Sequence, residues 1–188
     1  MNRRTTLIAF HWLTAVLIAA SFSVAWLRDW MDDYDRRLFW LDVHRSIGFA
    51  VLAITLLRLP QRAMLGPVSQ RGEFARVLWI ASRVTHGVLY AGLIVMPLLG
   101  WAQSSARSRH VALFGLGLPS LVKHDRDLAD TLGWWHEQVG WVLLGFIGLH
   151  VAAALVHHFV FRDETLQSMF LVSRHRAGGI AVAKNDDS

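Results

Sequence analysis

Five histidines lie within long apolar stretches of the sequence, where ionisable side chains are rare. These residues are His11, His44, His86, His136 and His150. An ionisable residue inside a membrane-length apolar segment is costly and indicates a functional site by default. A single imidazole there can simply hydrogen-bond a neighbouring helix, but five in one short chain point to ligands of a cofactor.

The stretches that hold these histidines are long enough to cross a bilayer. A transmembrane helix needs about 20 mainly apolar residues, and here 54% of residues are hydrophobic while only 18% are charged. We expect four spans, at about 7–27, 38–60, 77–101 and 131–161. Short connections predict an all-α, up-and-down four-helix bundle in the membrane, a fold that builds cofactor sites between facing helices.

The basic residues predict how this bundle is oriented. Lys and Arg number eleven on the side of the N-terminus and eight on the other, which favours cytoplasmic N- and C-termini. Ser23-Val24-Ala25 imitates a signal-peptide cleavage site, but the apolar run before it is long for a signal peptide, so we expect the first span to be retained. Residues 1–173 then form one domain, followed by a polar cytoplasmic tail at 174–188.

The depths of the histidines predict two pairs. Fourteen residues separate His136 from His150, which is about 21 Å along a helix and within about 40° of one face. His44 lies near the start of its span, at the depth of His136. His11 precedes Leu27 by sixteen residues, or about 24 Å, which is close to the depth of His150.

Two imidazoles facing each other suit a haem better than a bare metal ion. Zinc generally takes three or four protein ligands, whereas a porphyrin already supplies four nitrogens and needs only two axial ligands. A small residue follows each proposed ligand by one turn and leaves room for a ring: Ala15, Gly48, Gly140 and Ala154. His86 has the depth of the inner pair but is followed by Tyr90, so it is an alternative inner ligand or a contact for a propionate or a quinone.

The composition excludes several other kinds of site. The chain has no cysteine, which excludes disulfides, iron–sulfur clusters and covalently attached c-type haem. The net charge of +5 is not gathered into a basic tract, so we expect no nucleic-acid partner.

Short motifs around the histidines resemble a known family. The residues concerned are His11-Trp12, His44 with Ile47-Gly48, His86 with Tyr90, Pro97-Leu98-Leu99-Gly100, Trp135-His136-Glu137 and the run from Gly148 to His158. From about residue 5 to 172, the chain is similar to the bacterial cytochrome b561 family. Its wider superfamily includes the cytochrome b subunits of nickel-iron hydrogenases and formate dehydrogenases.

This resemblance implies a function. It implies a multi-pass cytochrome of the bacterial inner membrane with two haems b, an oxidoreductase that takes electrons from periplasmic superoxide and reduces ubiquinone. The family's axial ligands fall on His11, His44, His136 and His150. On this view Arg45, Arg107, Arg109 and Lys123 steer superoxide, while His157, His158, Arg83 or His86 contact the quinone.

Two alternatives stay open at this point. The protein is either a quinone-linked cytochrome b subunit that serves a partner dehydrogenase or hydrogenase, or a haem-binding membrane protein without enzymatic activity. Short loops favour a self-contained protein over a subunit with a docking surface. Reduction of the haems by quinol or superoxide would exclude the non-enzymatic alternative.

Overall fold

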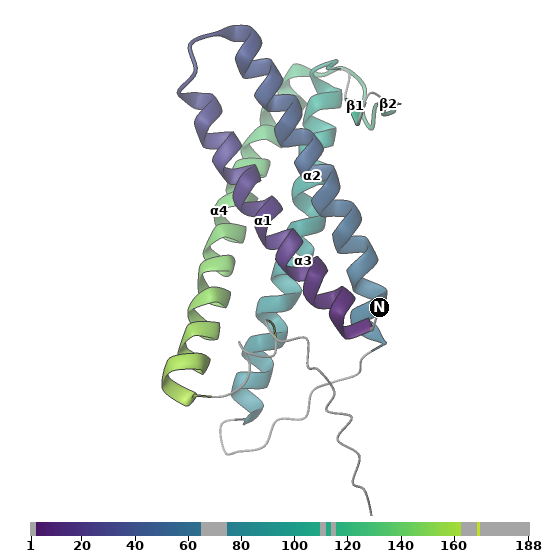
Figure 1. Ribbon diagram of the computed structural model, residues 1–188. Helices are drawn as coiled ribbons and strands as arrows, with labels where there is room; N and C mark the ends of the chain where they lie inside the picture. Colours follow the sequence, from purple (N-terminus) through teal and green to yellow (C-terminus); the bar gives the residue numbers. More distant parts are fainter. Residues whose placement is uncertain (1–2, 65–74, 110–111, 114–115, 163–168, 170–188) are drawn as a thin grey trace, which may run out of the picture.

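The computed structural model describes residues 3–64, 75–109, 112–113, 116–162 and 169, and this part of the chain is almost entirely helical. Figure 1 shows long helices that run up and down between the two ends of a bundle. They are α1 (Arg3–Asp29), α2 (Tyr34–Ala63), α3 (Ala75–Ala106) and α4 (Arg126–Val156), and α4 continues into a π-helical turn, η1 (His157–Phe161). All four are long and apolar enough to span a membrane. The expected membrane bundle is therefore confirmed.

α1, α2 and α4 begin several residues earlier than the hydropathy predicted, and for α2 and α4 an N-cap explains the start. The side chain of Asp33 accepts a hydrogen bond from the backbone N–H of Arg36, and the side chain of Asp125 does the same for Leu128. Aspartate is a favoured N-cap because its side chain satisfies a backbone N–H that has no partner inside the helix. The polar first turns that follow each cap are helical but lack the apolar residues by which the spans were recognised.

Two local features depart from the expected uniform helices. Strands β1 (Ala112–Leu113) and β2 (Leu116–Gly117) pair antiparallel in the connection between α3 and α4. The π-helix at His157–Phe161 ends at Arg162, whose φ of 52° is left-handed. The predicted tail at 174–188 lies outside the described residues, and the single-domain division and the cytoplasmic location of both termini stay predictions.

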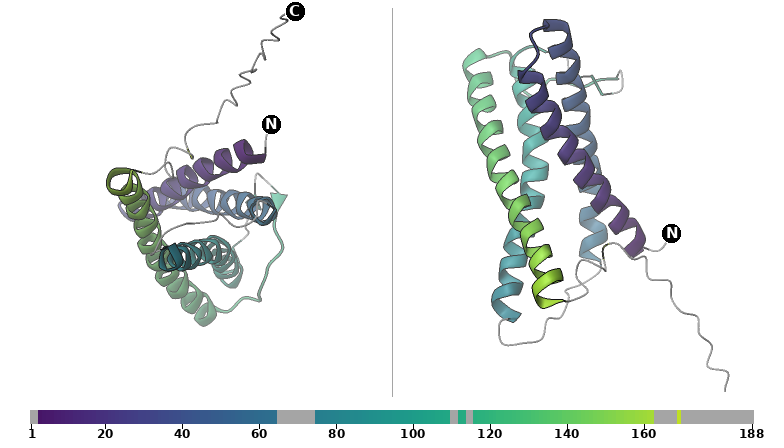
Figure 2. Two further views of the ribbon diagram at one scale, coloured as in Figure 1. Left: turned by 90° about the horizontal axis from the view of Figure 1, so that it is seen from below. Right: turned by 60° about the vertical axis from the view of Figure 1, so that its left-hand side comes forward.

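The bundle consists of two helical hairpins. Contacts are most numerous between α1 and α2 and between α3 and α4, and are sparser between α2 and α3. Figure 2 shows the same pairing from below. A small apolar layer, Val51, Leu93 and Leu143, joins the hairpins near mid-height. Large apolar side chains cover the outer faces, as expected where lipid is the solvent.

α3 packs tightly against α4 at Gly92. A Cβ added there would lie 2.9 Å from Cδ1 of Leu143, which is buried in the apolar layer. Overpacking of this kind typically costs about 1–3 kcal/mol. We expect Gly92→Val to lower the thermal unfolding midpoint of the detergent-solubilised protein. Gly145→Val is the matched control, because nothing lies within 4 Å of a Cβ at that position; equal losses in both variants would contradict the packing argument.

Candidate functional site

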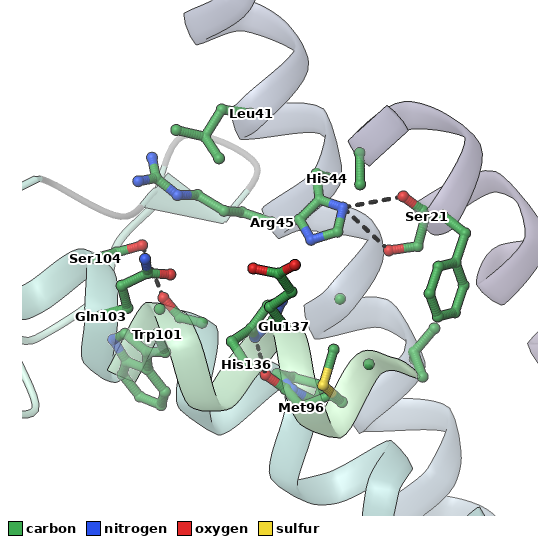
Figure 3. Close-up of a pocket in the computed structure, with 18 of the residues that line it drawn as sticks. Ser21, Leu41, His44, Arg45, Met96, Trp101, Gln103, Ser104, His136 and Glu137 are labelled. Carbon is green, nitrogen blue, oxygen red and sulfur yellow. Dashed lines mark hydrogen bonds between the residues drawn. The ribbon is translucent and has the colours of Figure 1, made fainter. Parts of the chain in front are cut away.

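His44 and His136 face each other in the half of the bundle where α2 and α4 begin, and these ends of the two helices lie uppermost in Figure 1. His44 comes from α2 and His136 from α4, and their ring centres are 6.1 Å apart. Figure 3 shows both imidazoles in one pocket, with His44 next to Ser21 of α1. We call this pair the upper site. It joins the two hairpins, since each contributes one imidazole.

Backbone carbonyls set the orientation of both upper imidazoles. His44 Nδ1 lies 3.1 Å from the carbonyl oxygen of Ser21, and His136 Nδ1 lies 3.1 Å from that of Met96. A carbonyl oxygen only accepts hydrogen bonds, so each Nδ1 carries the proton and each Nε2 keeps a free lone pair. Such contacts commonly fix the tautomer of metal-bound histidines. Both rings are therefore prepared to bind a metal through Nε2.

A cavity of about 520 Å³ surrounds the upper site. This volume falls within the range of about 300–1,000 Å³ that is usual for small-molecule and cofactor pockets. Gly48 and Gly140, one turn after the two histidines, line it. A Cβ at Gly100 would lie 3.3 Å from the His136 ring, so α3 approaches this imidazole closely at a residue without a side chain.

The cavity is rich in arginine. Arg28, Arg45, Arg107 and Arg109 line it, against two acidic residues, Asp29 and Glu137. Arg45 pairs with Asp42 at 2.8 Å and Arg28 with Asp29 at 3.4 Å, yet the Nε atoms of both arginines are buried without a hydrogen-bond partner. Buried donors are normally satisfied. The upper site therefore has unused donors that suit an acidic group.

Three imidazoles meet in the half of the bundle nearer the N-terminus, which we call the lower site. The ring centres of His11 and His150 are 6.1 Å apart, and those of His86 and His150 are 5.2 Å apart. His86 Nδ1 lies 2.7 Å from the carbonyl oxygen of Ser82, whereas His11 Nδ1 lies 3.4 Å from Nη2 of Arg58. The structure thus brings the predicted pair together and adds His86 at its edge.

Of the four residues predicted to contact a quinone, His86 belongs to the lower site and the other three lie beyond it. His157 and His158 belong to η1, where their rings contact Phe161 and Phe159 respectively. Arg83, one turn before His86 on α3, stacks over Trp79, with its guanidinium carbon 4.9 Å from the ring centre. These three side chains lie near the end of the bundle.

The residues predicted to steer an anion gather at the upper end. Arg107 forms an ion pair with Asp130 at 2.8 Å, and Arg45 is paired with Asp42. Arg109 lines the upper cavity and also a second cavity of about 440 Å³, which Lys123 shares. Within the described ranges, neither Arg109 nor Lys123 forms an ion pair with an acidic residue. Their charges are thus the least neutralised of the four.

The sequence pattern that defines prokaryotic cytochrome b561 matches residues 2–171. The chain belongs to this family. It is therefore a membrane haem protein of a family that carries out electron transfer and binds haem b.

Relatives of this cytochrome b561 chain agree over most of its length. It is 32% identical over 165 residues to the Yersinia pestis protein named probable superoxide oxidase CybB. The aligned region covers 86% of this chain and 92% of the relative. It is 26% identical over 166 residues to cytochrome b561 homolog 2 of Escherichia coli strain K12, covering 86% and 87%. Homolog 1 of the same organism is 26% identical over 173 residues, covering 90% and 97%.

The geometry of this cytochrome fits haem. Two imidazoles bound to opposite faces of one metal, with metal–nitrogen distances of about 2 Å, have ring centres roughly 6 Å apart. The observed separation is 6.1 Å in both His44–His136 and His11–His150. Across the described segments, no group of three or more His, Asp or Glu side chains is arranged to hold a bare metal ion.

Several residues of these sites were not anticipated from the sequence. Neither Arg28 nor Arg58 was singled out from the sequence, yet each has a buried, unsatisfied Nε. Ser21 and Ser82 contribute the carbonyl and hydroxyl oxygens next to His44 and His86. Arg58 could have been recognised from the sequence, because a charged residue inside a span needs a partner in the bundle. No sequence signal identifies a carbonyl that faces another helix.

Proposed function

We propose that the protein oxidises superoxide to oxygen and uses the electrons to reduce ubiquinone, with two haems b between the two substrates. His44 and His136 would hold the upper haem, and His11 and His150 would hold the lower haem. Two superoxide anions each lose one electron, and the two electrons with two protons convert ubiquinone to ubiquinol. The chain is thus proposed to be an oxidoreductase of the bacterial inner membrane.

The observation that carries this proposal is the paired imidazoles of the upper site within a cavity that four arginines also line. An anionic substrate is attracted to such an end of the molecule, since clustered charge raises its encounter rate. The 32% identity to a protein named probable superoxide oxidase supports superoxide as that anion.

The chain's own side chains have defined tasks in this scheme. When bound by two imidazoles, haem has no open coordination position and exchanges single electrons rather than binding oxygen. The carbonyls of Ser21 and Met96 hold the ligands with Nε2 free. The apolar layer of Val51, Leu93 and Leu143 lies between the two histidine levels and forms part of the lining of the upper cavity.

We propose that the upper site faces the periplasm, with both termini in the cytoplasm. The excess of Lys and Arg at the N-terminal side supports this orientation. Ubiquinone then reacts near the lower site, where His86, His157, His158 or Arg83 donates hydrogen bonds to its oxygens and supplies protons. Entry from the surrounding lipid requires no water-filled channel.

The decisive experiment is stopped-flow mixing of the purified protein with superoxide, with and without ubiquinone. We expect prompt haem reduction by superoxide, followed by reoxidation only when ubiquinone is present. Rapid reduction by quinol without any response to superoxide would instead indicate a cytochrome b subunit that serves a partner enzyme. Failure of both donors to reduce the haems would leave only the non-enzymatic alternative.

Reversing the charge of Arg109 tests the steering of superoxide. We expect Arg109→Glu to lower the second-order rate constant for haem reduction about tenfold at low ionic strength, because long-range attraction is weakened. The deficit should shrink as salt is added, since the Debye length falls to about 10 Å at 0.1 M. Arg37→Glu makes the same change of net charge on α2, outside the upper cavity, and serves as control. Equal effects of both substitutions would contradict local steering.

A further inference from the structure

Arg58 is a cation inside a membrane span and forms no ion pair with an acidic residue of the described segments. It lies on α2 and is half-buried. Its Nη2 is 3.4 Å from Nδ1 of His11 on α1, and its guanidinium carbon is 5.8 Å from the ring centre of Tyr90 on α3. None of the ion pairs found in the described part of the chain includes Arg58, and its Nε is buried with no hydrogen-bond partner. A charge in this position is costly unless it is paired.

The contact between Arg58 and His11 is unfavourable if His11 binds iron through Nε2. A neutral imidazole that gives the Nε2 lone pair to a metal carries its proton on Nδ1. Guanidinium nitrogens only donate hydrogen bonds, so two donors then face each other at 3.4 Å. His44, His136 and His86 each have a backbone carbonyl at Nδ1 instead. Of these four histidines, only His11 has a donor instead of an acceptor at Nδ1, so it requires an additional acceptor.

A second unsatisfied group lies one turn away on the same helix. The side chain of Thr55 is fully buried, and its Oγ1 has no hydrogen-bond partner. Residues three apart on a helix are neighbours. Two unsatisfied polar side chains on adjacent turns indicate that their partner is supplied by a bound group rather than by the chain.

We propose that Arg58 binds a propionate carboxylate of the lower haem, and that His11 Nδ1–H and Arg58 share this acceptor. The inference rests on the proposed function in assuming a haem between His11 and His150. A carboxylate supplies both the negative charge and the acceptor oxygens that the site lacks, and arginine binds carboxylates through a planar fork of donors. A neutral quinone would leave the charge of Arg58 unbalanced. A lipid phosphate would require the guanidinium to face outward, whereas it contacts α1 and α3.

This arrangement has a consequence for electron transfer. An uncompensated carboxylate disfavours the addition of an electron to the neighbouring haem, and the guanidinium cancels that effect. Arg58 therefore raises the reduction potential of the lower haem above the value that it would have without this contact. A higher potential favours the arrival of electrons at the quinone end.

The test is redox potentiometry of the full-length protein, combined with resonance Raman measurement of the propionate bending band. We expect Arg58→Gln to lower the reduction potential of the lower haem by about 59 mV. For a one-electron couple, this shift is a tenfold change in the equilibrium distribution of the electron between the two haems. The upper haem should be unchanged, and a propionate band should move. Arg62→Gln, an exposed arginine one turn further along α2, is the matched control.

Several outcomes would overturn the inference. Unchanged potentials and an unchanged propionate band in Arg58→Gln exclude the carboxylate contact. Slower reoxidation by quinone with unchanged potentials assigns Arg58 to the quinone instead. If Arg58→Gln loses the haem, Arg58→Lys decides: a retained haem with a shifted propionate band supports the contact, and an unchanged band excludes it. Failure of the proposed function is measured separately, on the unmodified protein: it would bind only one haem or would not be reduced by superoxide.

Discussion

Replacing His136 with alanine is expected to remove one of two haems and leave the other in place. The ring of His136 faces only His44 among the histidines of the upper site, and its orientation is fixed by Met96. Loss of contacts that merely orient a metal ligand typically costs about 10–100-fold in affinity or activity. Loss of the ligand itself should therefore lower superoxide-driven ubiquinone reduction by more than about 100-fold. The pyridine haemochrome assay of the purified variant measures the haem content.

The double variant makes this prediction sharper. His44→Ala should lose the same haem, and His44→Ala combined with His136→Ala should lose no more than either substitution alone, because both imidazoles bind one iron. His124→Ala is the matched control, since His124 also places Nδ1 near a backbone carbonyl, that of Ala106, but is not one of the paired imidazoles. Retention of both haems in His136→Ala would exclude the ligand assignment at the upper site.

The second large effect concerns the choice between His11 and His86. We expect His11→Ala to lose the lower haem and His86→Ala to keep it with an unchanged low-spin spectrum. The reason is the separation of ring centres, which is 6.1 Å for His11–His150 and only 5.2 Å for His86–His150. An iron between two imidazoles, with metal–nitrogen bonds of about 2 Å, requires ring centres roughly 6 Å apart. The separation between His86 and His150 is too short for this.

The opposite result in these two variants would exchange the roles of His11 and His86. His86 is held by Ser82 with its Nε2 free, as a ligand would be. Haem loss in His86→Ala with retention in His11→Ala would therefore assign His86 to the iron and His11 to the neighbouring polar group. Electron paramagnetic resonance of the oxidised protein distinguishes the cases, because loss of one axial imidazole converts a low-spin haem to a high-spin one. His157→Ala serves as the control on the same end of the bundle.

The sequence predicted those features that depend on position along a helix. Hydropathy located the four spans, and the rise of a helix placed His11 level with His150 and His44 level with His136. The structure brings both sets of rings together, although their binding of haem stays a prediction. Depth can be predicted because a membrane span has a known direction and a fixed rise per residue.

Features that depend on the rotation of one helix against another were not predicted. The approach of Ser21 to His44 and of Arg58 to His11 requires knowing which faces meet. The early helix starts were within reach of the sequence, since Asp33 and Asp125 are ordinary N-caps. The π-helix at His157–Phe161 depends on a single extra residue in one turn, and no pattern of apolar residues records it.

The division of the bundle into two hairpins has a consequence for how the protein matures. Each proposed haem is held by α4 from one hairpin and by α1 or α2 from the other, while protein contacts between the hairpins are sparse. Newly inserted chains would thus begin as two loosely associated helix pairs, and cofactor loading would be the event that locks them together. The haem-free protein is then expected to be less stable than the haem-bound form, because a ligand that binds only the folded state stabilises it.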